Sequence, residues 1–155
     1  MGEKKRENRR QQKAQEPERH YDFGSFRGYA LPRYTQIPDE ILDKQMAFLS
    51  HAELRVLLYI ARKTFGYGKE ADSISISQLV HGTRTRDGEW IDFGTGLSRR
   101  SVYAAIKGLE EKGLIVVERR VSPAGDRDIS TYRLRLSQGG GAIFAPRWCN
   151  DCLLY

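Results

Sequence analysis

Basic and aromatic side chains gather at the start of one amphipathic stretch of the sequence. Residues 99–112 carry apolar residues at helical spacing, and between these lie Arg99, Arg100, Tyr103 and Lys107. A guanidinium group pairs with a phosphate or a guanine edge, and a tyrosine stacks or forms a hydrogen bond. These residue types at this spacing predict a helix face that binds a polyanion. A solvated helix face with a random order of charges is the alternative.

The order of charges along this stretch is unfavourable for an isolated helix. The basic residues come first, and Glu110 and Glu111 come in the C-terminal half. The helix dipole prefers acids at the N-terminus and bases at the C-terminus, by about 0.3–1 kcal/mol per charge. A helix that enters the major groove of DNA by its N-terminal residues explains this order, because it keeps positive charge next to the phosphates.

A second group of basic residues follows in a predicted β-hairpin. Along 130–136 apolar and basic residues alternate after a turn at 122–126, so Tyr132, Leu134 and Leu136 are expected to face inward. The outer face is then basic, although arginines also protect exposed edge strands from pairing. The hairpin residues that we expect to contact DNA are Arg119, Arg120, Arg127 and Arg133, with Arg135 on the same outer face.

A third basic group lies in residues 82–97, before the first stretch. This segment is longer than the turn of three or four residues that is usual in a helix-turn-helix. Asp87-Gly88 predicts a tight turn within it. We expect Arg84 and Arg86 to contact DNA phosphates. A packed surface loop held by Trp90 is the alternative.

The elements that position these residues begin with two helix signals. A proline and two acids at 38–40 predict a helix start. Ser50 and Glu53 form a capping box, which opens a helix that runs as far as Phe65. This helix has two apolar stripes, so we expect it at the centre of the core.

The remaining signals complete an order of elements. A second capping box opens a short helix at 76–81, and Ser98 is the predicted N-cap of the helix at 99–112. Three helices followed by a β-hairpin predict a mainly α fold with a small β-hairpin wing, the winged helix-turn-helix. The helix at 99–112 takes the recognition position in that plan.

Composition fits one domain with tails. The chain has 155 residues, 39% of them hydrophobic and 30% charged, and a net charge of +6 that favours polyanionic partners. We expect a basic arm and linker at 1–33, the DNA-binding domain at 34–137 and a Gly-rich tail at 138–155. The arm either follows DNA phosphates or is a solvated tail. With neither a long apolar run nor a signal-like start, the sequence predicts a cytoplasmic protein with no membrane partner.

Residue patterns for catalysis or cofactors are weak. Cys149 and Cys152 form a C-x-x-C pair, which is half of a zinc site or a redox pair, but an incidental pair in a tail is the favoured interpretation. Three scattered histidines, His20, His51 and His81, form no ligand pattern, and the Gly-Thr-Gly at 94–96 is too short for a dinucleotide fingerprint. We therefore expect a protein that is not an enzyme and that holds no cofactor and no metal.

Several stretches of the chain together form a recognisable set of motifs. They are residues 34–42, 49–50, 53–69, 72–79 and 95–102, and Arg-Lys-Thr-Phe-Gly at 62–66 is the most specific part. Over roughly 34–116 the chain closely resembles the N-terminal domain of the phage replication protein O family. The resemblance implies binding of double-stranded DNA at repeated sites of a replication origin, with Arg99, Arg100, Tyr103 and Lys107 in contact with DNA. It also implies the replicative helicase or its loader as a protein partner.

Two other functions are compatible with the same fold. A winged-helix transcription regulator binds an operator and usually dimerises to match two half-sites, and we find no long apolar helix outside the domain to serve as a dimer interface. A winged helix that binds proteins would expose an apolar recognition face, which Arg100, Tyr103 and Lys107 contradict. The sequence does not predict the oligomeric state.

Overall fold

The computed structural model describes residues 19–29, 34–119 and 129–137. Contacts divide the chain into two units, Met1–Leu31 and Pro32–Tyr155. In the first unit a 3-10 turn, η1, spans Phe23–Ser25, and the side chain of Asp22 accepts a hydrogen bond from the amide of Gly24 at 2.9 Å. Every described residue of this unit is exposed.

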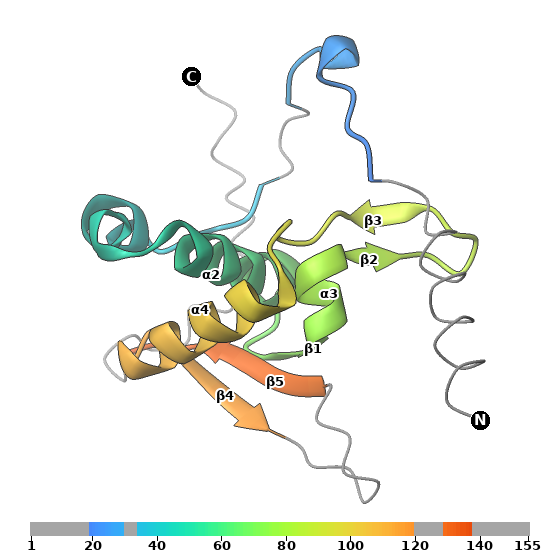
Figure 1. The fold of residues 1–155 in the computed structure, drawn as a ribbon. Helices are drawn as coiled ribbons and strands as arrows, with labels where there is room; N and C mark the ends of the chain where they lie inside the picture. The colour runs from blue at the N-terminus through green and yellow to red at the C-terminus, as the bar shows by residue number, and fades with distance from the viewer. Residues whose placement is uncertain (1–18, 30–33, 120–128, 138–155) are drawn as a thin grey trace, which may run out of the picture. The chain divides into compact units, whose positions relative to one another are not determined.

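Helix α2, His51–Thr64, lies at the centre of the second unit (Figure 1). The predicted capping box is confirmed: Ser50 accepts from the amide of Glu53, and Glu53 accepts from the amide of Ser50 at 2.8 Å. Val56, Leu57, Ile60 and Ala61 on this helix are almost completely buried. The expectation that this helix forms the centre of the core is therefore confirmed.

Two further helices pack on α2 and on each other. Helix α3, Ile76–His81, begins with the predicted capping box of Ser75 and Gln78. Helix α4, Arg99–Glu111, contacts both α2 and α3. In Figure 1, α4 crosses in front of α2, and α3 lies near the N-terminal end of α4. Both predicted helices are confirmed, with α4 ending one residue before the expected boundary.

A small antiparallel sheet closes the core. Strands β4, Ile115–Arg119, and β5, Ile129–Leu134, form the predicted hairpin. Strand β1, Asp72–Ser75, adds to the other edge of β5, so the order is β1-β5-β4. The prediction of a mainly α fold is therefore too narrow, because the structure is a mixed arrangement of helices and a small antiparallel sheet.

Side chains of β5 alternate between the core and the surface. Tyr132 and Leu134 are buried as predicted, and Arg133 is exposed. The prediction that Leu136 faces inward is wrong: it is 52% exposed, because the strand ends at Leu134 and its alternation ends there too.

The long segment between α3 and α4 forms a second, two-stranded sheet. Strand β2, Thr83–Arg84, pairs antiparallel with β3, Trp90–Asp92. The Asp87-Gly88 turn is confirmed: the amide of Thr85 donates to Glu89 at 2.8 Å, and the amide of Gly88 donates to Thr85. This hairpin projects beside α3 in Figure 1.

The segment before α2 is less regular than predicted. After Pro38 two helical residues lead into a π-helical turn, η2, Ile41–Gln45, and a 3-10 turn, η3, Met46–Phe48. Only Ile41 of these two turns is buried. One buried residue does not provide the continuous apolar stripe that would align a regular α-helix on the core.

Within the described part of the chain, no helix combines the length and the apolar character that a membrane span requires.

Candidate nucleic-acid interface

The orientation of α4 is set by its apolar stripe. Its buried residues point toward the other helices and the sheet, which leaves the opposite side of the helix in solvent. Ser98 caps the N-terminus by accepting a hydrogen bond from the amide of Ser101 at 3.1 Å. The buried residues of α4 are Val102, Ala105, Ile106 and Leu109.

The four side chains predicted on the solvent side of α4 all lie there. Arg99, Arg100, Tyr103 and Lys107 are exposed, with Tyr103 at 52%. The ammonium of Lys107 lies 3.7 Å from the carboxylate of Glu111, and both side chains are largely in solvent. Such an exposed ion pair contributes little to the stability of the protein, so Lys107 can exchange Glu111 for a phosphate at a small cost in free energy.

Both ends of α4 are fixed to the core by long-range contacts. Before the helix, the amide and hydroxyl of Thr95 both donate to the carbonyl of Leu79 on α3, at 2.8 and 2.7 Å. After it, the ammonium of Lys112 donates to the buried carboxylate of Glu53 on α2 at 2.5 Å. Burial alone would raise the pKa of Glu53, but the bonds from Lys112 and Ser50 hold it below its ordinary value. The exposed face is thus held on a rigid support.

The arginine at the end of β4 is already paired within the protein. The guanidinium of Arg119 donates two hydrogen bonds to the carboxylate of Glu110 on α4, one of them 3.0 Å long. This bidentate pair raises the pKa of Arg119. Arg119 is among the residues predicted to contact DNA, and no pattern in the sequence indicates this partner nine residues away on another element.

Arg133 lies on the opposite side of the sheet from α4. It is exposed on β5 beside the buried Tyr132, and side chains alternate along a strand. On the same outer face, Thr131 is hydrogen-bonded to Ser73 of β1 at 3.0 Å. The structure therefore does not bring Arg133 together with the basic face of α4. Arg120 and Arg127, also predicted to contact DNA, lie outside the described residues.

The β2–β3 hairpin separates its two arginines. The guanidinium of Arg84 stacks over the ring of Trp90, 3.8 Å from the ring centroid, and Arg84 is half-buried. Arg86 is exposed in the turn. This placement matches the packed-loop interpretation for Arg84 and leaves Arg86 available for a phosphate.

Asp92 connects this hairpin to α2. Its carboxylate accepts hydrogen bonds from the ammonium of Lys63 at 2.7 Å, from the hydroxyl of Tyr59 at 3.0 Å and from the amide of Gly94 at 2.9 Å. Burial would raise the pKa of Asp92, but these bonds, led by that from Lys63, keep it below the ordinary value. Burial also raises the pKa of Tyr59. No pattern in the sequence indicated this cluster, because its members are far apart in the chain.

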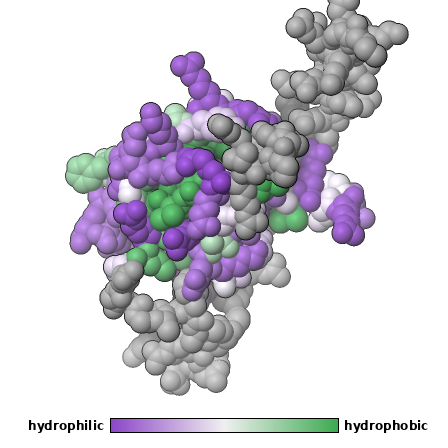
Figure 2. All heavy atoms as spheres, turned by 90° about the horizontal axis from the view of Figure 1, so that it is seen from below, coloured by the Kyte–Doolittle hydropathy of each residue, from purple (hydrophilic) through white to green (hydrophobic). Residues whose placement is uncertain are grey.

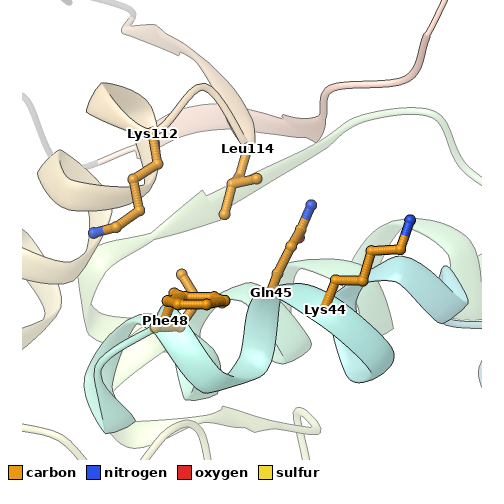
Figure 3. Close-up of a pocket in the computed structure, with 6 residues that line it drawn as sticks. Lys44, Gln45, Phe48, Lys112 and Leu114 are labelled. Carbon is orange, nitrogen blue, oxygen red and sulfur yellow. The ribbon is translucent and has the colours of Figure 1, made fainter.

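A shallow cleft of about 310 Å³ lies between the end of α4 and the turns before α2 (Figure 3). Lys112 and Leu114 lie on one side of it, with Gln45 and Phe48 on the other. The residues that line it include two lysines but no acid, histidine, cysteine, serine or threonine. Among the described residues, no group of three or more His, Cys, Asp or Glu side chains could hold a metal ion. Cys149 and Cys152 lie outside the described residues.

One face of the protein is largely polar (Figure 2). Figure 2 shows this face, on which hydrophilic residues surround a smaller hydrophobic group.

Comparison with known families gives one match. The family model described as bacteriophage replication protein O matches residues 32–132, which include α2, α3, α4, β1 to β4 and the first part of β5. Comparisons with curated proteins and with solved structures gave no match.

Proposed function

The chain belongs to the bacteriophage replication protein O family, and from this premise we propose that residues 34–137 form a winged-helix module that binds double-stranded DNA at repeated sites of a replication origin. In this proposal α4 enters the major groove, and the β4–β5 hairpin is the wing. The role is one of binding and needs no catalytic group.

One observation carries the proposal: the basic and aromatic residues of α4 lie together on its exposed face, toward the N-terminus. A major groove is wide enough to admit an α-helix, and its base edges present distinct donors and acceptors. Arg100 suits a guanine edge or a phosphate, and Tyr103 suits a hydrogen bond or a stacking contact. Ala104, exposed beside Tyr103, is small enough to let the helix backbone approach the bases.

In this proposal the predicted contacts divide into a centre and a periphery. Arg99, Arg100, Tyr103 and Lys107 form the centre of the proposed interface, and Arg86 is a peripheral phosphate contact. Arg84, Arg119 and Arg133 are secondary, because Arg84 is half-buried and stacked on Trp90, Arg119 is held by a bidentate pair with Glu110, and Arg133 lies on the outer face of the sheet.

Binding to labelled duplexes that tile the coding region and its flanks, at two salt concentrations, tests the proposal. We expect tight, salt-sensitive binding that is confined to a repeat array. Binding confined to a promoter would instead identify the protein as a transcription regulator, the alternative function. Equal binding to a random duplex would refute sequence-specific recognition.

The proposed protein partner is the replicative helicase or its loader. Co-purification of the chain with each of these proteins, with and without origin DNA, tests this assignment. Failure in both conditions would refute it without affecting the DNA-binding proposal.

A further inference from the structure

The first unit exposes a group of aromatic rings. Tyr21 and Phe23 are 49% and 81% exposed, and Phe26 and Tyr29 are 41% and 89% exposed. The rings form two edge-to-face pairs, with centroids 4.7 Å apart for Tyr21 and Phe23 and 5.0 Å apart for Phe26 and Tyr29. These rings do not form a core, because every described residue of the unit is exposed. Aromatic surface gathered in this way marks a binding site more often than isolated exposed rings do.

The sequence before and between these rings is cationic. Arg27 lies between the last two rings in sequence, and its guanidinium donates to the carbonyls of Gly24 and Phe26 at 3.0 and 3.4 Å. Residues 1–20 carry seven Lys and Arg against four Glu, so the sequence around the rings has a net positive charge. Gly28 has a φ of 118°, and a side chain there would meet no atom within 4 Å, so the backbone between Arg27 and Tyr29 is open to solvent.

We propose that residues 19–29 bind single-stranded DNA. Bases of an unpaired strand stack on Phe23 and Tyr29, and the guanidinium of Arg27 neutralises a phosphate. Stacking needs bases that are free of a complementary strand, so this site discriminates between single-stranded and duplex DNA. It is thus a second binding activity, separate from that of α4. The choice of DNA over RNA rests on the proposed function, since an origin-binding protein works where strands separate.

The test uses the full chain and two double variants. Phe23→Ala with Tyr29→Ala removes both stacking rings, while Phe23→Tyr with Tyr29→Phe keeps them. Phe48→Ala is the matched control, because Phe48 is 82% exposed, like Phe23, but lies on η3 in the second unit. These substitutions affect exposed side chains, so the fold is expected to remain intact. The ligands are labelled oligo-dT of about 16 nucleotides, oligo-U of the same length and the tightest-binding duplex.

We expect the double alanine variant to bind oligo-dT at least about tenfold more weakly and to bind the duplex as the unchanged protein does. The variant with Phe23→Tyr and Tyr29→Phe, and Phe48→Ala, should retain affinity for oligo-dT.

The proposal is overturned if the unchanged protein does not bind oligo-dT, if it prefers oligo-U, or if the double alanine variant keeps its affinity for oligo-dT. Equal weakening by Phe48→Ala would also overturn it. Weaker duplex binding by Arg100→Ala tests the α4 interface separately, so failure of one site is distinguishable from failure of the other.

Discussion

The guanidinium of Arg119 at the end of β4 forms a bidentate ion pair with the carboxylate of Glu110 near the end of α4. The pair joins the proposed wing to the proposed recognition helix. It also compensates the charge of Arg119, so that positive charge on this side of the molecule is concentrated in the N-terminal half of α4. A phosphate that contacts Arg119 must compete with Glu110.

Glu110→Gln is therefore expected to strengthen duplex binding. Loss of the carboxylate makes the guanidinium of Arg119 available to a phosphate and removes a negative charge near the proposed DNA interface. The slope of log K against log salt should become steeper by about 1. Anisotropy titrations at several salt concentrations measure both effects. Glu111→Gln, which weakens only the exposed pair with Lys107, should change the affinity less; an equal effect of the two variants would contradict a specific role for the Arg119 pair.

Arg100→Ala and Tyr103→Ala should each weaken binding to the preferred duplex by about 1–3 kcal/mol, if they contact base edges. Binding to a random duplex should fall less, because a base contact carries sequence information and a phosphate contact does not. Competition titrations with both duplexes give the ratio of the affinity for the preferred duplex to the affinity for the random duplex. Arg55→Ala removes the same charge from an exposed position of α2 and serves as the control. Equal losses for Arg55→Ala and Arg100→Ala would place the interface elsewhere.

The two arginines of the β2–β3 hairpin are expected to differ. Arg86→Ala should weaken binding to all duplexes alike and reduce the salt slope by about 1. Arg84→Ala should instead lower the free energy of unfolding by about 1 kcal/mol, through loss of the stack on Trp90. Urea denaturation and salt-dependent titrations separate the two effects. Unchanged duplex affinity in the double alanine variant would exclude the hairpin from the interface.

Much of the fold was predictable from the sequence, because the sequence signals that specify its helices lie within short stretches of the chain. The capping boxes at Ser50 and Ser75 and the apolar stripe of α4 each involve residues within a few turns of one helix. Local hydrogen bonds and periodicity specify such elements. The same stripe predicted which side of α4 faces solvent, and so it predicted the centre of the candidate site.

The remaining features depend on residues that are distant in the chain. Strand β1 pairs with β5 through Ile74 and Ser130, and Lys63 reaches Asp92 across 29 residues. Neither relationship follows from the spacing of residues in the sequence. Tertiary packing decides which strand edge is next to β1 and which cation is next to Asp92. For this reason the third strand of the sheet and the partner of Asp92 could not be found from the sequence.

Asp92→Asn is expected to destabilise the protein at neutral pH by about 1–3 kcal/mol, because it leaves the half-buried Lys63 ammonium without its ion pair. The pKa of Asp92 is lower in the folded protein than its ordinary value. Its contribution to stability is therefore complete above the unfolded-state pKa and is lost as the pH falls toward the folded-state pKa. Urea denaturation of both proteins should show a difference that shrinks below about pH 4. Asp87→Asn, in the exposed turn, is the control; a difference for Asp92→Asn that persists undiminished in acid would exclude the ion pair as its cause.

Gly94→Ala should be among the most destabilising single substitutions between α3 and α4. Gly94 has a φ of 69°, which costs a residue with a Cβ about 1–2 kcal/mol. An added Cβ would also lie 2.5 Å from the amide nitrogen of Gly82 and 3.0 Å from the carbonyl of Leu79. Because both neighbours are backbone atoms, they cannot rotate away as a side chain does. We therefore expect a loss of at least about 3 kcal/mol.

Gly88→Ala separates the two contributions to this loss. Gly88 has a φ of 90°, but an added Cβ there would meet no atom within 4 Å. It should therefore show the cost of the left-handed backbone alone, about 1–2 kcal/mol. Urea denaturation gives the free energy of unfolding of each variant. If Gly88→Ala and Gly94→Ala lower the free energy of unfolding equally, the close packing of Gly94 against Gly82 and the end of α3 does not fix the start of α4.

If Gly94→Ala lowers it more, this packing holds α4 in place, and duplex affinity should fall in Gly94→Ala but not in Gly88→Ala.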